Sequence, residues 1–467
     1  MFLKAQVIMT EGPIWKKMIL FAFPIFLGQL FQQLYNTADS LIVGNFLGSQ
    51  ALAAVSSSGN LIFLMIGFFN GMSMGAGVVI SRLFGAGLKE EMTDTIYTTV
   101  ALAFVIGLVL TALGTYLSPI LLEWMQTPSE VLAQSNLYFS IYFLGSLGLV
   151  LYNFLSGIMR AVGDSTTPLY FLILSSLLNI VLDIVFITRL DMDVDGAAYA
   201  TIISQFVSAF LSLLVMLRKN VAYHISLLKI RFYKGCMTEI IRYGVPTGIQ
   251  NSIISIANVV VQSNINAFGA MAMAGCGAYS KVEGFAFLPI MSFNMAISTF
   301  VSSNIGANKL KRAYDGAKFG IWCSVICAQV IGMLMLLNAR PVIALFDPNP
   351  DVISFGAERI WCNCWFYFLL AYSHAVASVL RGGGKPTIPM YVMLICWCAL
   401  RIGFLMVTGY LFHNIWFVYW VYPLTWGASS ILFFFFFRSR SWLYDKRFIQ
   451  QEKIMAEDTQ EETEQTI

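Results

Sequence analysis

Acidic residues lie inside long apolar stretches of this 467-residue chain, where a charged side chain is unfavourable. Asp39, Asp183 and Glu283 are the acids placed deepest in such stretches. Each costs about 2.5–3.5 kcal/mol at a bilayer centre, so it persists where it faces protein or water, usually for function. Carboxylates in such surroundings predict reversible binding of a proton or cation. Lys281 lies two residues from Glu283, which is also consistent with a position of Glu283 nearer a helix end. For all three acids, the alternative is a structural role as a hydrogen-bonded carboxyl group.

Polar residues accompany two of these acids at helical spacing. Three of them precede Asp39 and share its helix face: Gln32, Tyr35 and Asn36. Asn179 lies four residues before Asp183, so the two side chains point the same way. Oxygen-rich sets of this kind suit Na⁺, and two carboxyl groups that share a site equally hold a proton. The spacing does not decide between H⁺ and Na⁺.

The composition predicts a polytopic membrane protein that must position these residues on helices. Hydrophobic residues make up 58% of the chain and charged residues 11%, against about 25% charged residues in soluble domains. The apolar runs are too long for barrel strands, so all-α spans are expected. The first apolar run is also too long for a cleavable signal peptide, and none is expected.

Several other classes of function are excluded or disfavoured. No phosphate-cradling glycine loop is present, so ATP is not expected to drive any activity. The eight cysteines lack zinc-finger spacing and fit small buried side chains. We expect no enzyme activity, no cofactor, no bound metal beyond Na⁺ at the coupling site, and no nucleic-acid partner.

The apolar pattern predicts twelve membrane-spanning helices. They cover about 15–43, 51–82, 93–117, 131–160, 166–188, 195–217, 236–268, 272–304, 313–338, 354–380, 387–409 and 414–437. Nearly all Lys and Arg then fall on one side of the membrane, while the other side has only Arg189, Arg340 and Arg359. The positive-inside rule places both termini in the cytoplasm of a cell membrane protein.

One segment is written twice, which indicates an internal repeat. Residues 159–170 return as residues 380–391, with Arg, Gly, Pro and Tyr each 221 positions later. Pro24 and Pro246, like Asn36 and Asn258, are 222 apart. Six crossings bring the chain back to its starting side, so the repeat is parallel, as in some transporters.

The repeat divides the chain into two six-helix lobes. Residues 1–217 form the N-terminal lobe, 218–235 a basic cytoplasmic linker, and 236–440 the C-terminal lobe. Residues 441–467 form an acidic cytoplasmic tail that is expected to be disordered. Arg160 and Arg381 are predicted to lie in exposed cytoplasmic turns, with a role in folding or topology or as a gate.

Prolines interrupt the first helix of each lobe. Pro24 and Pro246 are expected to kink those helices and free backbone carbonyls. A bending helix that gates access and a fixed kink that serves packing are equally consistent with this pattern.

Three motifs together resemble the multidrug and toxic compound extrusion (MATE) family, in its prokaryotic first-lobe-aspartate form. They are Thr10-Glu11-Gly12-Pro13-Ile14, Leu34-Tyr35-Asn36-Thr37-Ala38-Asp39 and the twice-written Arg-x-x-Gly-x-x-x-x-Pro segment, and the resemblance covers about residues 10–440. It implies two six-helix lobes that form a V. It also implies secondary active multidrug efflux, with organic and often cationic or polyaromatic compounds exported by antiport with H⁺ or Na⁺.

The resemblance also assigns residues to roles. It maps cation or proton coupling onto four positions: Asp39, Asn179, Asp183 and Thr201. It adds Tyr138 and Asn153 to Gln32, Tyr35, Asn36 and Glu283 as candidate residues of a substrate cavity. Pro24 and Pro246 are the candidate gating positions because of the kinks that they are expected to cause. Because Glu283 is the only acid deep in the second lobe, coupling is expected in the first lobe.

Two other functions are alternatives for an apolar helical chain of this kind. A lipid-linked oligosaccharide or lipid flippase of the same superfamily would show a strongly cationic cavity, and Arg401 is the only deep arginine that the pattern predicts. A membrane enzyme or receptor would not need the repeat. The expected partners are therefore small organic substrates and the lipid bilayer, and the expected state is a monomer.

Overall fold

The helices of the described residues fit the twelve predicted crossings, nine as single helices and three as two helices in succession. The computed structural model describes residues 6–124, 129–412 and 414–444. The helices of the first lobe are α1 (Ile14–Phe46), α2 (Ser49–Ala86), α3 (Lys89–Trp124), α4 (Ser129–Leu144), α5 (Ser146–Ala161), α6 (Thr166–Arg189) and α7 (Val194–Met216). Those of the second lobe are α8 (Lys234–Asn266), α9 (Ala270–Gly306), α10 (Leu310–Leu337), α11 (Ala339–Ala344), α12 (Pro350–Asn363), α13 (Tyr367–Gly382), α14 (Thr387–Met393), α15 (Leu400–Phe412) and α16 (Ile415–Arg438).

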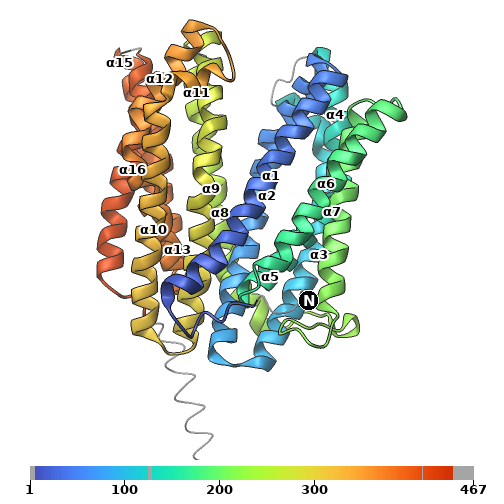
Figure 1. Ribbon diagram of the computed structural model, residues 1–467, viewed down its shortest axis with the longest axis vertical. Coiled ribbons are helices and arrows are strands. Elements are labelled where there is room, and N and C mark those ends of the chain that lie inside the picture. The colour runs from blue at the N-terminus through green and yellow to red at the C-terminus, as the bar shows by residue number, and fades with distance from the viewer. Residues whose placement is uncertain (1–5, 125–128, 413, 445–467) are drawn as a thin grey trace, which may run out of the picture.

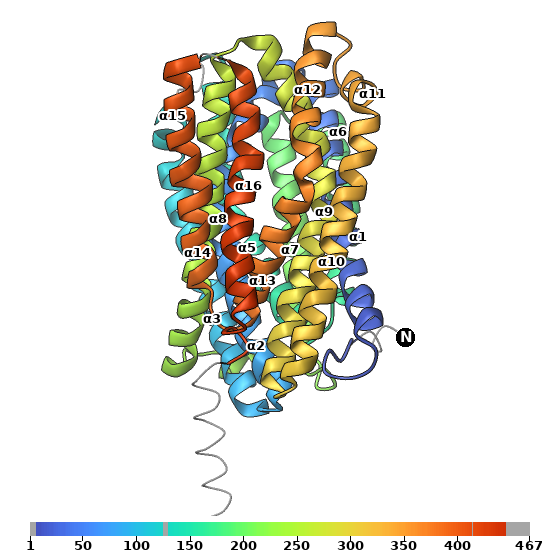
Figure 2. The same ribbon diagram turned by 90° about the vertical axis from the view of Figure 1, so that its left-hand side faces the viewer.

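The two lobes stand side by side, as the repeat predicts. Helices α1–α7 form the N-lobe and α8–α16 form the C-lobe, and their ribbons approach each other at one end and diverge at the other (Figure 1). Figure 2 turns the C-lobe toward the viewer and shows its helices running along the long axis of the molecule. We call the end where the lobes meet the base and the opposite end the rim.

Three of the predicted crossings are interrupted. Gly145 separates α4 from α5, which meet at 47°. A 3-10 turn at Cys364–Phe366 separates α12 from α13, and a π-helical turn at Leu394–Ala399 joins α14 to α15. Among the described residues, eight helices are long and apolar enough to cross a membrane alone, and the bent α4–α5 pair makes a ninth. The all-α, membrane-spanning prediction is confirmed.

Glycines bring the lobes together at the base. A Cβ atom on Gly71 or Gly75 of α2 would collide with the backbone of Gly248 or Gly244 of α8. Nearer the base, Ser81 and Ser303 share a hydrogen bond of 2.7 Å between their hydroxyl oxygens. Small residues permit this backbone approach between helices in a membrane, so the base forms the tight contact between lobes.

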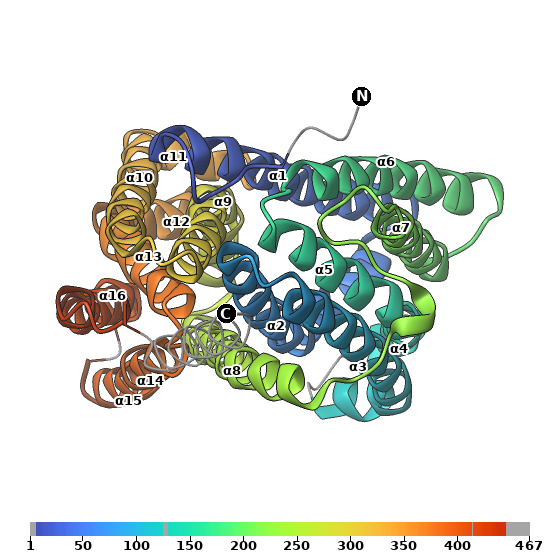
Figure 3. The same cartoon turned by 90° about the horizontal axis from the view of Figure 1, so that it is seen from below.

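The first helix of each lobe begins against the other lobe. Met18 and Phe21 of α1 are fully buried in the C-lobe core, whereas Gly28 lies against Leu172 of α6 in the N-lobe. Viewed from below, α1 runs from beside α10 to beside α6 (Figure 3). Pro24 therefore lies close to the point where α1 passes from one lobe to the other.

The same crossing occurs in the second repeat. Ile240 of α8 is fully buried in a core cluster of the N-lobe, and Ile265, near the other end of α8, is fully buried in the C-lobe core. Pro246 again lies between the two parts. Both predicted prolines are inside continuous helices, at positions where bending would change how the lobes meet.

Terminal segments cover the twice-written turns. The Gly163 carbonyl accepts a hydrogen bond of 2.9 Å from the Val7 amide, and a Cβ on Gly383 would collide with the Trp442 backbone. Trp442 is fully buried and stacks on Phe437 at 5.7 Å. Trp442 and Leu443, which the sequence analysis assigned to the tail, are thus buried against the C-lobe, and residues 445–467 lie outside the described part.

Candidate functional site

Three helices of the N-lobe bring the predicted coupling residues together. Asp39 comes from α1, Asn179 and Asp183 from successive turns of α6, and Thr201 from α7. The carboxyl groups of Asp39 and Asp183 lie close enough to interact electrostatically. The Asn179 amide nitrogen lies 3.4 Å from the Thr201 hydroxyl, which itself donates to the Ala197 carbonyl at 3.0 Å.

This cluster is deeply buried and poor in hydrogen bonds. Asp183 has no exposed surface and Asn179 is 1% exposed, while Asp39 is half-buried. Among the described residues, none donates a hydrogen bond to Asp39 Oδ1, Asn179 Oδ1 or either Asp183 oxygen. Buried polar oxygens are normally paired, because an unpaired one has lost its contacts with water. Four such oxygens at one place are what a proton or Na⁺ would satisfy.

Tyrosines surround the acid pair. Tyr35 of α1 lies beside Asp39, and Tyr138 of α4 lies near both Asp39 and Asp183. Tyr142, one turn after Tyr138, stacks on it with ring centroids 6.2 Å apart and also lies near Asp39. An acid flanked by aromatic rings attracts organic cations through charge and through the ring faces.

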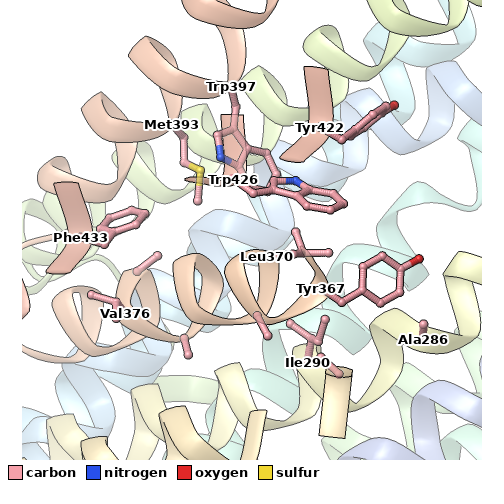
Figure 4. Packing of buried hydrophobic residues seen from close by; sticks show 14 of the residues in the cluster. Ala286, Ile290, Tyr367, Leu370, Val376, Met393, Trp397, Tyr422, Trp426 and Phe433 are labelled. Carbon is pink, nitrogen blue, oxygen red and sulfur yellow. The ribbon is translucent and has the colours of Figure 1, made fainter. Parts of the chain in front are cut away.

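The C-lobe holds a second cluster of buried charges around Glu283 of α9. Tyr279 donates a hydrogen bond of 2.7 Å to Glu283 Oε1, and Tyr367 lies 3.5 Å from the same oxygen. Asn363 donates to the Tyr279 hydroxyl at 3.2 Å. Figure 4 shows the hydroxyls of Tyr367 and Tyr422 pointing to the same side, away from Trp397.

Two arginines complete this C-lobe cluster. Arg359 lies over the rings of Tyr279 and Tyr422, at 4.5 and 5.1 Å from their centroids, and donates to the Tyr422 hydroxyl at 3.1 Å. Arg401 donates to Asn258 at 3.0 Å and to Thr425 at 3.1 Å. Both are buried, with 2% and 0% of their surface exposed. The C-lobe cluster thus contains two arginines and one acid, whereas the N-lobe cluster contains two acids.

Comparison with known proteins identifies the family. A family model for MatE matches residues 24–185 and again residues 246–407. The chain belongs to the MatE family. The two matches start 222 residues apart, as Pro24 and Pro246 do, so the family model recognises the same repeat that the sequence predicted.

Relatives of this MatE chain agree in length and fold. It is 28% identical over 439 residues to the probable multidrug resistance protein YoeA of Bacillus subtilis, covering 92% of this chain and 94% of that one. It is 29% identical over 400 residues to the probable multidrug resistance protein NorM of Thermotoga maritima, covering 84% and 85%. A solved structure described as the outward-facing conformation of a multidrug resistance MATE family transporter superposes with a TM-score of 0.86 at 22% identity, covering 93% and 97%.

Not every predicted residue of this MatE protein lies beside the acid pair. Gln32 and Asn36 are exposed on α1. Asn153 of α5 donates to the Leu149 carbonyl of its own helix and accepts a bond from Ser73 through its backbone oxygen. The described contacts of Asn153 therefore belong to helix packing.

Two predictions about arginines are wrong. Arg381 is 6% exposed inside α13, where it donates to Ser378 at 2.7 Å and lies 3.5 Å from Gln250, so it is not in an exposed turn; Arg160 is half-buried at the end of α5. Arg359 belongs to the buried C-lobe cluster, whereas the sequence analysis placed it on the non-cytoplasmic side of the membrane. Its long side chain reaches two tyrosines of other helices, which hydropathy along one segment cannot reveal.

Sequence reasoning missed Tyr142 and Gln205. Gln205 of α7 lies at the Tyr142 hydroxyl, next to the acid pair. Tyr142 follows Tyr138 by one helical turn, so spacing alone was sufficient to place it on the same face.

Proposed function

We propose that this MatE protein is a secondary active multidrug efflux transporter that exports organic, often cationic or polyaromatic compounds by antiport with H⁺ or Na⁺. The observation that carries the proposal is the acid pair of the N-lobe, with four buried oxygens that no described residue pairs. The names of the two bacterial relatives support the multidrug substrate range. The protein acts in the cell membrane as a monomer, with both termini and the base on the cytoplasmic side.

The coupling cation and the substrate compete for the same negative charge. When the acids are ionised, Asp39 and its tyrosines attract a cationic compound. When H⁺ or Na⁺ neutralises Asp39 and Asp183, that attraction is lost and the compound leaves. The two ligands must weaken each other by equal free energies, because linkage between binding equilibria is reciprocal.

The crossed helices support alternating access as part of this proposal. Opening the base requires the first part of α1 to leave the C-lobe core, or its outer part to move against α6. Pro24 breaks the helical hydrogen-bond ladder close to that crossing, so bending there costs less than in an uninterrupted helix. Cation binding at Asp39, on the outer part of α1, is thereby coupled to the base. An inside-negative potential of 100 mV adds about 2.3 kcal/mol per charge moved.

The flippase alternative is less well supported. A flippase would need a strongly cationic path, but the two clusters together contain three acids and two arginines. Both arginines are buried and occupied by Tyr422, Asn258 and Thr425. Each arginine is thus partly bonded within the C-lobe, although Nε of both and Nη1 of Arg359 have no hydrogen-bond partner among the described residues.

Transport by purified protein in liposomes tests the proposal. We expect Asp39→Asn to abolish export of a fluorescent organic cation that is driven by an ion gradient, while the protein still elutes as a folded monomer in detergent. Asp191→Asn is the matched control, because Asp191 is exposed beyond α6 and its positive φ of 49° is readily adopted by Asn. Full transport by Asp39→Asn would exclude this site.

The coupling ion is identified in the same vesicles. An inward Na⁺ gradient is applied with the proton gradient collapsed by an uncoupler, and then a proton gradient without Na⁺. Export under the first condition alone identifies Na⁺ coupling, and export under the second alone identifies H⁺ coupling. Export under neither condition would contradict ion-coupled antiport.

A further inference from the structure

The two lobes present opposite charges at the level of their buried clusters. The N-lobe has Asp39 and Asp183 with no cation among their described partners. In the C-lobe, Arg359 and Arg401 exceed the single charge of Glu283. Arginine stays protonated in proteins, so this second cluster carries a net positive charge.

Nearby charged residues do not reverse this sign. Lys281 is exposed on α9 and Glu358 is half-buried on α12, so their opposite charges offset each other. The rings of Tyr279 and Tyr422 lie against the guanidinium groups, and the neutral Tyr367 hydroxyl lies near Glu283. The ring faces hold the guanidinium groups in place without cancelling their charge.

The clusters are close enough to act on one small molecule. The Gln33 amide of α1 lies 3.8 Å from the point that a Cβ on Gly284 would take, so α1 and α9 touch there. Gly284 is the neighbour of Glu283, and Asp39 lies six residues beyond Gln33, or about 9 Å along a helix. Asp39 thus lies less than two helical turns along α1 from the contact of that helix with α9.

Neither arginine needs to touch a compound to influence it. Charges in a low-dielectric interior act over longer distances than in water, because few mobile ions screen them. Walls of low dielectric also focus the field into the space between them. A compound between the lobes would therefore meet a negative N-lobe and a positive C-lobe.

We propose that Arg359 and Arg401 make this transporter select compounds that carry an anionic group in addition to a cationic group. The cationic group lies toward Asp39 and the anionic group toward the C-lobe cluster. This inference rests on the proposed function and names a substrate class for it. Arg359 and Arg401 act as specificity-determining residues through their charge, and Glu283 opposes them.

A pair of matched dyes tests this selection. Rhodamine B carries a xanthylium cation and a carboxylate, whereas its ethyl ester carries the cation alone. Initial rates of export from liposomes give kcat/KM for each dye, and the ratio of acid to ester is the readout. We expect the ratio to fall three- to tenfold in Arg401→Gln and in Arg359→Gln, and to rise in Glu283→Gln.

The ratio is expected to change in opposite directions in the arginine variants and in Glu283→Gln. A folding defect does not produce this pattern, because a damaged protein loses the export rates of both dyes together. Arg401→Lys retains the charge and should retain the ratio. Arg340→Gln removes an exposed arginine of α11 and is the control for net charge, with no change expected. If Arg401→Gln does not fold, the dye ratios of Arg359→Gln and Glu283→Gln still test the proposed selection.

The outcomes separate the two proposals. Export of both dyes with equal ratios in wild type and all charge variants would overturn the selection while leaving efflux intact. A ratio that changes in the same direction in Arg401→Gln and Glu283→Gln would overturn it as well. Failure of either dye to move under any ion gradient would instead contradict the proposed function.

Discussion

The buried clusters of the N-lobe and the C-lobe differ in which residues carry their charges and in how those residues are paired. At an offset of 221 or 222 residues, Asp39 corresponds to Val261 and Asp183 to Phe404. The C-lobe has fully buried Val261 where the N-lobe has an acid. Its own charges come from Arg359, Arg401 and Glu283, each of which has at least one side-chain or ring partner in the described structure, although Nε of both arginines and Nη1 of Arg359 have no hydrogen-bond partner there.

This difference separates stability from function. Groups that are paired hold a lobe together, while groups left unpaired lower stability and persist where a ligand completes them. We therefore expect substitutions in the N-lobe site to remove activity with little loss of stability. Substitutions in the C-lobe cluster should destabilise the protein first.

The largest effect is expected from Asp183→Asn. The amide cannot release a proton or supply the charge that binds Na⁺, so ion-driven export should fall by at least about 100-fold, or roughly 2.7 kcal/mol in free energy. Initial rates in liposomes measure this change. Phe404→Leu at the corresponding C-lobe position should keep at least half of the rate; comparable losses in both variants would remove the distinction between lobes.

Arg359→Met should have the largest effect on stability. It removes one of the two arginine charges that act on Glu283 and leaves the Tyr422 hydroxyl without its donor, and a hydrogen bond to a charged group contributes about 1.5–3 kcal/mol. Unfolding in detergent, followed by the loss of the monomer peak with temperature, measures it. Asp183→Asn should unfold within a few degrees of wild type. The reverse order would show that the N-lobe site is the structural one.

Two threonines provide a matched pair with smaller effects. Thr201→Val removes a hydroxyl beside Asn179, and a hydrogen bond is worth about 0.5–1.5 kcal/mol, so the concentration of coupling ion for half-maximal transport should rise three- to tenfold. Thr425→Val removes an acceptor of Arg401 and should lower thermal stability without changing that concentration. A change in ion dependence in Thr425→Val would link the C-lobe to coupling.

Tyr367→Phe is expected to have the smallest effect. Its hydroxyl is 3.5 Å from Glu283 and 3.0 Å from Tyr279, and the shorter bond from Tyr279 remains. Stability should drop by about 1 kcal/mol, and Tyr279→Phe should lose more because its bond to Glu283 is 2.7 Å. Thermal unfolding of the two variants side by side gives the order.

Much of the membrane architecture could be predicted because hydropathy is a local property. Runs of apolar residues locate the crossings, and the offset between Pro24 and Pro246 reveals the repeat. The interruptions at Gly145 and Cys364–Phe366 could not be predicted, since each continues an apolar run without a strong breaking signal. The spacing within α6 likewise placed Asn179 and Asp183 on one face.

The sequence by itself determined which acids are exceptional, because a carboxylate in an apolar run is costly wherever the helix packs. Only the tertiary structure decided which groups meet. It brought Asp39 of α1 to Asp183 of α6, and it buried Arg359 between tyrosines of α9 and α16. It also took α1 from one lobe to the other close to Pro24. Contacts between distant segments depend on how helix faces pack, and the composition of a single helix does not specify its partner.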